Sequence, residues 1–192
     1  DFLAFSGHKM MGPTGTGVLY GKTKVLENME QFIVGGETVV DSTYESYSRE
    51  ELPNRFEAGL QDYAGIIGLG EACRYLRKIG QSKIASHEIK INKIISESLL
   101  NNKKISVIGP KEAEKRSGIF SFNIEGINPL DVARILDNSR AVLIRSGAHC
   151  AHSWFNNRNL KGSARASFYL YNTEKEAEIF VEEIKKISSF SS

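Results

Sequence analysis

Cysteine is scarce in this sequence, which holds only Cys73 and Cys150 among its 192 residues. Two cysteines are too few for a disulfide framework, and Cys73 lies in a helical pattern, so a reducing, cytoplasmic setting is expected. Long apolar runs are lacking as well. None approaches the roughly 20 residues that a membrane-spanning helix needs, so we expect no membrane partner.

A charge excess of one sign is also absent. Lys and Arg total 25 against 23 Asp and Glu, a net charge of +2, and the basic residues are scattered along the chain. Nucleic acids and anionic membranes usually select a basic stripe or patch. The charge pattern therefore disfavours both partners and is compatible with small anionic ligands.

The chain begins without Met, directly in the apolar run of residues 2–5. This beginning suggests that an upstream half has been removed and that the chain is the C-terminal half of an enzyme. With 41% apolar residues the chain can bury a sizeable core, as one domain or one and a half.

The apolar spacing divides the first part of the chain into two strands, a loop and two helices. The expected strands cover residues 2–6 and 17–21, on either side of a glycine-rich loop. Residues 34–63 hold many Gly, Ser, Thr and charged residues, which predicts a long irregular loop. Helical spacing follows at residues 65–79 and 82–100.

The second part alternates short strands with helices. Four strands are expected, at residues 105–108, 119–124, 141–145 and 164–170. A helix is expected at residues 130–138, behind Pro129, and the last helix begins at Thr173. Glu176 follows Thr173 by three residues, the spacing of a capping box. This mixture predicts an α/β or α+β fold class.

Lys9 is the first candidate for chemistry. It follows an apolar strand, and α/β sheets bind their ligands at strand ends. Ser6 and His8 stand beside it and can donate hydrogen bonds to a phosphate. A lysine amine can hold an aldehyde cofactor as an imine, although an isolated lysine is more often a solvated surface residue.

Cys150 is the second candidate, in the polar and flexible stretch Arg-Ser-Gly-Ala-His-Cys-Ala-His of residues 145–152. Nearby imidazoles and a guanidinium favour the thiolate that attacks sulfur, whereas a lone cysteine is otherwise often a buried apolar residue. A zinc site of His149, Cys150 and His152 is a further alternative. Neighbouring positions rarely converge on one ion and no fourth ligand is evident, so no metal is expected.

Arg165 is the third candidate, in the small-residue run Gly-Ser-Ala-Arg-Ala-Ser of residues 162–167. A guanidinium is costly there unless a carboxylate pairs with it. That carboxylate belongs either to a substrate or to an internal Asp or Glu.

Four segments together resemble class V aminotransferase-fold cysteine desulfurases of the sulfur-mobilisation type. They are residues 5–17 (FSGHKMMGPTGTG), 55–59 (RFEAG), 145–150 (RSGAHC) and 165–173 (RASFYLYNT). The match is collinear over nearly the whole chain. The resemblance implies the α/β, pyridoxal-phosphate-dependent transferase fold of type I. Residues 1–79 would then be the C-terminal part of the large cofactor-binding domain, and residues 80–192 the small domain.

The resemblance also implies roles for the candidate residues. Lys9 would form the Schiff base with pyridoxal phosphate, and Ser6 and His8 would hold the phosphate. Cys150 would take sulfur from L-cysteine as a persulfide and leave L-alanine. Substrate binding is implied for two further residues: the carboxylate anchor Arg165 and the secondary anchor Arg145.

A homodimer that passes sulfur to an acceptor or scaffold protein, for iron–sulfur cluster assembly, is implied as well. The isolated chain is expected to be inactive without the upstream half. A selenocysteine lyase or a cysteine sulfinate desulfinase of the same fold is the main alternative, because Lys9, Cys150 and Arg165 would serve all three reactions. A catalytically silent module that only docks a partner is the alternative from another class.

Overall fold

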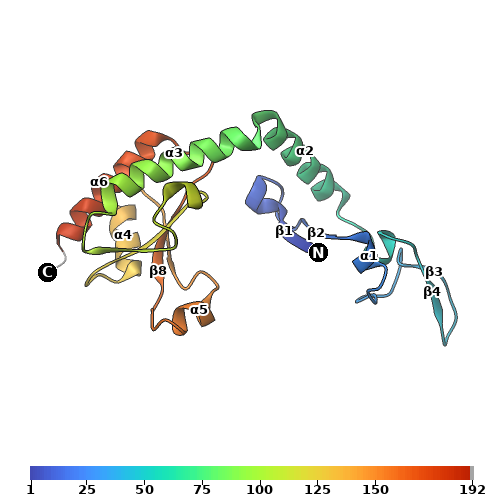
Figure 1. Ribbon diagram of the computed structural model, residues 1–192. Helices are drawn as coiled ribbons and strands as arrows, with labels where there is room; N and C mark the ends of the chain where they lie inside the picture. The colour runs from blue at the N-terminus through green and yellow to red at the C-terminus, as the bar shows by residue number, and fades with distance from the viewer. Residues whose placement is uncertain (191–192) are drawn as a thin grey trace. The chain divides into compact units, whose positions relative to one another are not determined.

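The computed structural model describes residues 1–190, and its internal contacts divide the chain into two compact units (Figure 1). The first unit is Asp1–Ile79, and the second begins at Gly80. Within the described residues no helix is both long enough and apolar enough to cross a membrane.

The first unit contains a two-stranded antiparallel sheet of β1 (Phe2–Ser6) and β2 (Gly17–Gly21). Both strands are as predicted, and a 3-10 turn, η1 (Gly7–Met10), follows β1. Within this unit no third strand pairs with β1 or β2. The large apolar side chains left exposed on the two strands are Phe2, Leu3, Phe5, Val18, Leu19 and Tyr20.

The prediction of an irregular loop at residues 34–63 is wrong. Strands β3 (Val39–Ser42) and β4 (Tyr47–Arg49) form an antiparallel hairpin there, and the short turn η2 (Asn54–Phe56) follows. At the tip of the hairpin, the Thr43 hydroxyl accepts hydrogen bonds from backbone N–H groups of Glu45 and Ser46. A threonine side chain thus closes this turn in place of the usual Asn-Gly or Asp-Gly signal.

Two helices complete the first unit. The four-residue helix α1 (Thr23–Leu26) is too short for the sequence pattern to reveal. The longer α2 (Tyr63–Ile79) confirms the helix expected at 65–79, and it buries Leu69, Ala72 and Leu76 at helical spacing.

The second unit is built on a four-stranded antiparallel sheet in the order β5-β6-β8-β7. Strands β5 (Ile105–Ile108) and β6 (Ile119–Ile124) lie where the sequence predicts them. Strand β7 covers only Arg145–Gly147, because the apolar residues before it form an irregular segment in which Val142 and Ile144 pack on the core. Strand β8 (Ser163–Ser167) ends early, where Asn172 closes a turn with Tyr169.

Helices α3 (Gln81–Leu99), α4 (Pro129–Arg140) and α6 (Glu174–Ser189) confirm the three helices expected in this unit. Figure 1 shows α3 and α6 side by side, and the two helices are in contact. The capping box of Thr173 and Glu176 is present at the start of α6. The turn η3 (Ala113–Lys115) and the short helix α5 (His152–Asn156) were not predicted.

The sheet of the second unit has one apolar face and one polar face. Phe120, Phe122 and Ile124 of β6 are buried in the core with apolar residues of α3, α4 and α6. Because side chains alternate along a strand, Ser121 and Asn123 point to the other face. The register places Arg165 of β8 opposite Ser121, so this guanidinium also belongs to the polar face.

Candidate functional site

The predicted cofactor residues lie together in the first unit, where β1 runs into η1. Ser6 is the last residue of β1, and His8 and Lys9 are exposed residues of η1. Among residues 1–190, no hydrogen bond or ion pair engages these three side chains. Their hydroxyl, imidazole and amine groups are therefore free to bind a ligand.

A short backbone turn fixes the position of these residues. The Gly7 N–H donates to the Thr16 carbonyl at 2.8 Å, and the Gly12 N–H donates to the Gly7 carbonyl at 2.9 Å. Gly7 is buried, and a Cβ atom there would collide with the side chain of Thr16. The close approach of the two segments thus requires glycine at this position.

The donor set of this region fits pyridoxal phosphate. A hydroxyl and an imidazole on nearby positions can donate to phosphate oxygens, and a lysine amine without a paired carboxylate can form an imine with an aldehyde. Ser6 and His8 would hold the phosphate of the cofactor, and Lys9 would hold its aldehyde carbon.

In the second unit, Arg145 of β7 and Arg165 of β8 are directly opposite each other in the antiparallel register. Residues in such a pair point to the same face of the sheet, and like charges there repel. Within the described residues, neither guanidinium has an ion pair with a carboxylate. The internal ion pair considered for Arg165 is therefore not present in this part of the chain.

In the described part of the chain, the Arg165 side chain also has a buried hydrogen-bond donor without an acceptor. Its Nε atom is buried and has no hydrogen-bond partner among the described residues. A buried donor without an acceptor is unfavourable, and two opposed guanidinium groups add repulsion. An anion, such as a carboxylate, would remove both costs.

Cys150 lies close to this arginine pair. The Arg145 Nη2 atom is 3.6 Å from the Cys150 Sγ atom, and Cys150 is exposed, which excludes the buried apolar alternative. The stretch expected to be flexible is instead a tight turn, in which the Ala151 N–H donates to the Ala148 carbonyl at 2.8 Å, before α5 begins. The positive charge of a guanidinium thus lies beside an exposed thiol.

His149 and His152 differ in their surroundings. His149 Nε2 is 2.9 Å from the Ser163 hydroxyl oxygen, whereas His152 is an exposed residue at the start of α5. Burial lowers the pKa of His149, and the nearby charges of Arg165 and Arg145 lower it further. Among residues 1–190, no group of three or more His, Cys, Asp or Glu side chains could hold a metal ion.

The structure therefore brings together Arg145, His149, Cys150 and Arg165 in the second unit, and Ser6, His8 and Lys9 in the first. Sequence reasoning missed Ser163, which is fully buried on β8 and contacts His149. No spacing rule connects two residues 14 positions apart. Only the pairing of β7 with β8 makes them neighbours.

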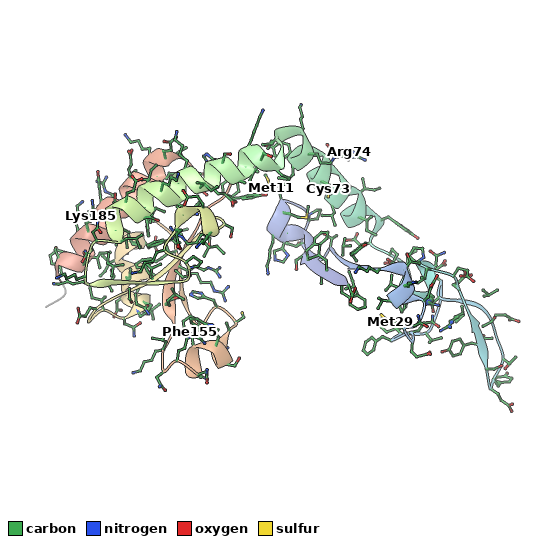
Figure 2. The ribbon with its side chains drawn as sticks, viewed as in Figure 1. Met11, Met29, Cys73, Arg74, Phe155 and Lys185 are labelled. Atoms are coloured by element: carbon green, nitrogen blue, oxygen red, sulfur yellow. The ribbon has the colours of Figure 1, made fainter. Side chains whose placement is uncertain are left out.

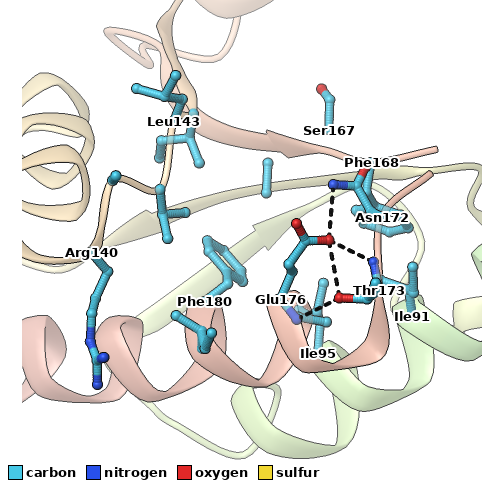
Figure 3. Close-up of a pocket in the computed structure, with 16 residues that line it drawn as sticks. Ile91, Ile95, Arg140, Leu143, Ser167, Phe168, Asn172, Thr173, Glu176 and Phe180 are labelled. Carbon is cyan, nitrogen blue, oxygen red and sulfur yellow. Dashed lines mark hydrogen bonds between the residues drawn. The ribbon is translucent and has the colours of Figure 1, made fainter.

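The second unit also has a cavity of about 370 Å³, which is lined by other residues (Figure 3). Apolar side chains of α3, α6 and the segment before β7 line most of it, and Asn172, Thr173 and Glu176 are joined by hydrogen bonds at its wall. Its lining includes Ala166, which points to the face of the sheet opposite Arg165. The cavity contains none of the predicted site residues.

Comparison with known proteins is consistent with this geometry. The family described as aminotransferase class V matches residues 1–180. A "Probable cysteine desulfurase" of Staphylococcus epidermidis is 40% identical over 193 residues, which cover 100% of this chain and 46% of the relative. A "Probable cysteine desulfurase" of Halalkalibacterium halodurans is 42% identical over 195 residues, which cover 99% of this chain and 46% of the relative.

A solved structure shows the same fold. The apo structure of cysteine desulfurase from Thermococcus onnurineus NA1 matches with a TM-score of 0.91 and 39% identity, over 98% of this chain and 47% of that chain. This match confirms the predicted fold, that of the type I pyridoxal-phosphate-dependent transferases. The chain spans about half the length of the curated relatives it matches.

Proposed function

Because the chain belongs to the class V aminotransferase family, we propose that it is the C-terminal part of a pyridoxal-phosphate-dependent cysteine desulfurase. Residues 1–79 would complete the large cofactor domain, and residues from 80 onward would form the small domain. One observation carries the proposal: Arg145 and Arg165, which have no carboxylate partner among the described residues, lie opposite each other beside the exposed Cys150 thiol. A carboxylate anchor next to a sulfur nucleophile suits an amino acid that gives up sulfur.

Lys9 has two tasks in this proposal. Its amine binds the cofactor covalently, and Ser6 and His8 hold the phosphate. When bound, pyridoxal phosphate supplies an electron sink that stabilises negative charge at the α carbon of an amino acid. In its unbound form the Lys9 amine would remove the α proton of the substrate as a general base.

Arg165 binds the substrate carboxylate in this proposal. Its buried Nε donor and its lack of a carboxylate partner support this role, because a bidentate carboxylate would satisfy the guanidinium. Arg145, directly opposite, adds positive charge on the same face and stays in contact with the Cys150 sulfur.

Cys150 accepts the sulfur. Its thiolate attacks the sulfur of the substrate, a sulfur–sulfur bond forms, and the carbon–sulfur bond of the substrate breaks. The electron pair of the broken bond stays with the substrate β carbon, which takes up a proton to complete L-alanine. The persulfide on Cys150 is exposed and can be transferred to an acceptor or scaffold protein, for which iron–sulfur cluster assembly is the proposed use.

The complete enzyme is proposed to be a cytoplasmic homodimer that includes an N-terminal portion, and the curated relatives, of which the chain covers 46%, are long enough to include one. Two free cysteines are compatible with a reducing compartment. The apolar side chains exposed on β1 and β2 support a covering portion, since a two-stranded sheet is marginally stable alone. Without this portion the chain is expected to be inactive.

The reaction can be tested with this chain combined with the N-terminal portion, in one polypeptide or as two. Alanine release is measured from L-cysteine, L-selenocysteine and cysteine sulfinate in parallel. The proposal expects alanine and stoichiometric persulfide or sulfide from L-cysteine. Faster turnover of selenocysteine or cysteine sulfinate would instead identify a lyase or desulfinase, and no alanine from any substrate would favour a silent binding module.

Replacing Arg165 by alanine is expected to weaken L-cysteine binding by about 2–4 kcal/mol, because a buried charge-assisted pair with the substrate carboxylate is lost. The absorbance of the lysine-bound cofactor should persist, and a cysteine titration of that absorbance measures the affinity. Arg158→Ala is the matched control, since Arg158 is exposed and stacks on Trp154 in the same unit. An unchanged affinity in Arg165→Ala would contradict the carboxylate assignment.

A further inference from the structure

The turn that carries Cys150 has an unfavourable backbone conformation. His149 and Cys150 have φ angles of 51° and 63°, so two consecutive residues with side chains adopt the left-handed region. This region is disfavoured for L-residues because Cβ approaches the following carbonyl oxygen. The conformation persists only if other contacts hold it.

The His149 ring provides such contacts on two sides. Its Nε2 atom is 2.9 Å from the Ser163 hydroxyl oxygen, and Ser163 is a fully buried residue of β8. On the other side, the ring packs against Phe155 of α5 in an edge arrangement, with a centroid distance of 6.0 Å and an angle of 61°. Phe155, labelled in Figure 2, is itself buried. The imidazole thus ties the turn to both neighbouring elements.

The strand that carries Ser163 is fixed by close packing. A Cβ atom on Gly162 would lie 2.7–3.0 Å from backbone atoms of Gly147, so β7 and β8 approach closely just before the turn. The Gly162 carbonyl also accepts a hydrogen bond from Asn123 Nδ2 at 3.1 Å. The Ser163 hydroxyl is therefore a rigid anchor, and Cys150 lies one residue beyond the anchored ring.

We propose that His149 is a positioning residue, whose hydrogen bond with Ser163 holds the left-handed turn and keeps the Cys150 thiol beside the Arg145 guanidinium. The meaning of this role for catalysis rests on the proposed function of Cys150. The geometry of the turn does not depend on that proposed function. Removing either partner of the hydrogen bond should release the turn and separate the thiol from its cation.

The electrostatic surroundings support a neutral ring. Burial first, then the charges of Arg165 on β8 and Arg145 on β7, lower the pKa of His149, and no carboxylate among residues 1–190 pairs with this ring. From α5 the ring meets the uncharged Phe155. Because the pKa of His149 is lowered when the turn is held by Ser163, the ring binds a proton more readily once the turn is released. The turn is then most stable above the ordinary histidine pKa of 6.5 and loses stability as the pH falls through the lower value.

The test is the pH profile of Cys150 alkylation by iodoacetamide, measured on the 192-residue chain in a Cys73→Ser background so that one thiol reacts. Ser163→Ala and His149→Gln are each expected to slow alkylation at pH 7 by about tenfold, because the Arg145 guanidinium no longer lies beside the attacking sulfur. His152→Ala is the matched control and should leave the profile unchanged. Circular dichroism checks that each variant is folded.

The double variant Ser163→Ala/His149→Gln makes the test specific. If both residues act through one hydrogen bond, the double variant should be no slower than the slower single variant. A parental profile in folded Ser163→Ala and His149→Gln chains, or single effects that multiply in the double variant, overturns the proposal. The assay uses neither cofactor nor cysteine, so an enzyme without desulfurase activity but with these profiles would refute only the proposed function.

Discussion

A Cys150→Ser variant of the complete enzyme is expected to release sulfide from L-cysteine at least about a thousandfold more slowly than the parent. Serine keeps the size of the side chain and can adopt the same left-handed backbone, but its hydroxyl stays protonated and is a poor nucleophile toward sulfur. The colour of the bound cofactor, and its change on adding cysteine, should remain. Sulfide release and absorbance measured on the same sample separate the two effects.

Cys73→Ser is the matched control for that variant. Cys73 is the other free thiol of the chain and lies on α2, in the first unit (Figure 2). This replacement should leave sulfide release unchanged. Parental release from Cys150→Ser would show that Cys150 is not the sulfur acceptor, and loss of release in Cys73→Ser would show that Cys73 is also needed.

The regular part of the fold could be predicted from apolar spacing. Strand β6 alternates buried Phe120 and Phe122 with partly exposed Ser121 and Asn123, and α2 repeats buried residues at helical spacing. These patterns arise because one face of each element packs on a core. The β3–β4 hairpin escaped prediction because its strands are largely exposed and therefore carry no alternation.

The chemistry of the site could be predicted more readily than its geometry. Residue type and immediate sequence neighbours made Lys9 a candidate for imine formation and Cys150 a candidate nucleophile. The opposition of Arg145 and Arg165 depends on the register of β7 against β8, and the sequence misplaced the start of β7. Register follows from pairing and turn geometry across the sheet, which the local sequence specifies poorly.

Replacing Lys9 by alanine is expected to have the other large effect, because two functions are lost at once. Without the amine the cofactor cannot be held covalently, so the absorbance of the lysine-bound form should disappear. Removal of the α proton should slow by about 10²–10⁴-fold, the usual contribution of a positioned general base. Proton exchange at the α carbon of cysteine or alanine in deuterated water measures this step without sulfur transfer.

Lys24→Ala is the matched control, because Lys24 is an exposed lysine of α1 in the same unit. It should keep both the absorbance and the exchange rate. The Lys9→Ala variant differs in kind from Cys150→Ser, which should keep proton exchange and lose only sulfur release. If Lys9→Ala retained the absorbance of a lysine-bound cofactor, another lysine would have to hold it. The free donors of Ser6 and His8 at the end of β1 would then need a different explanation.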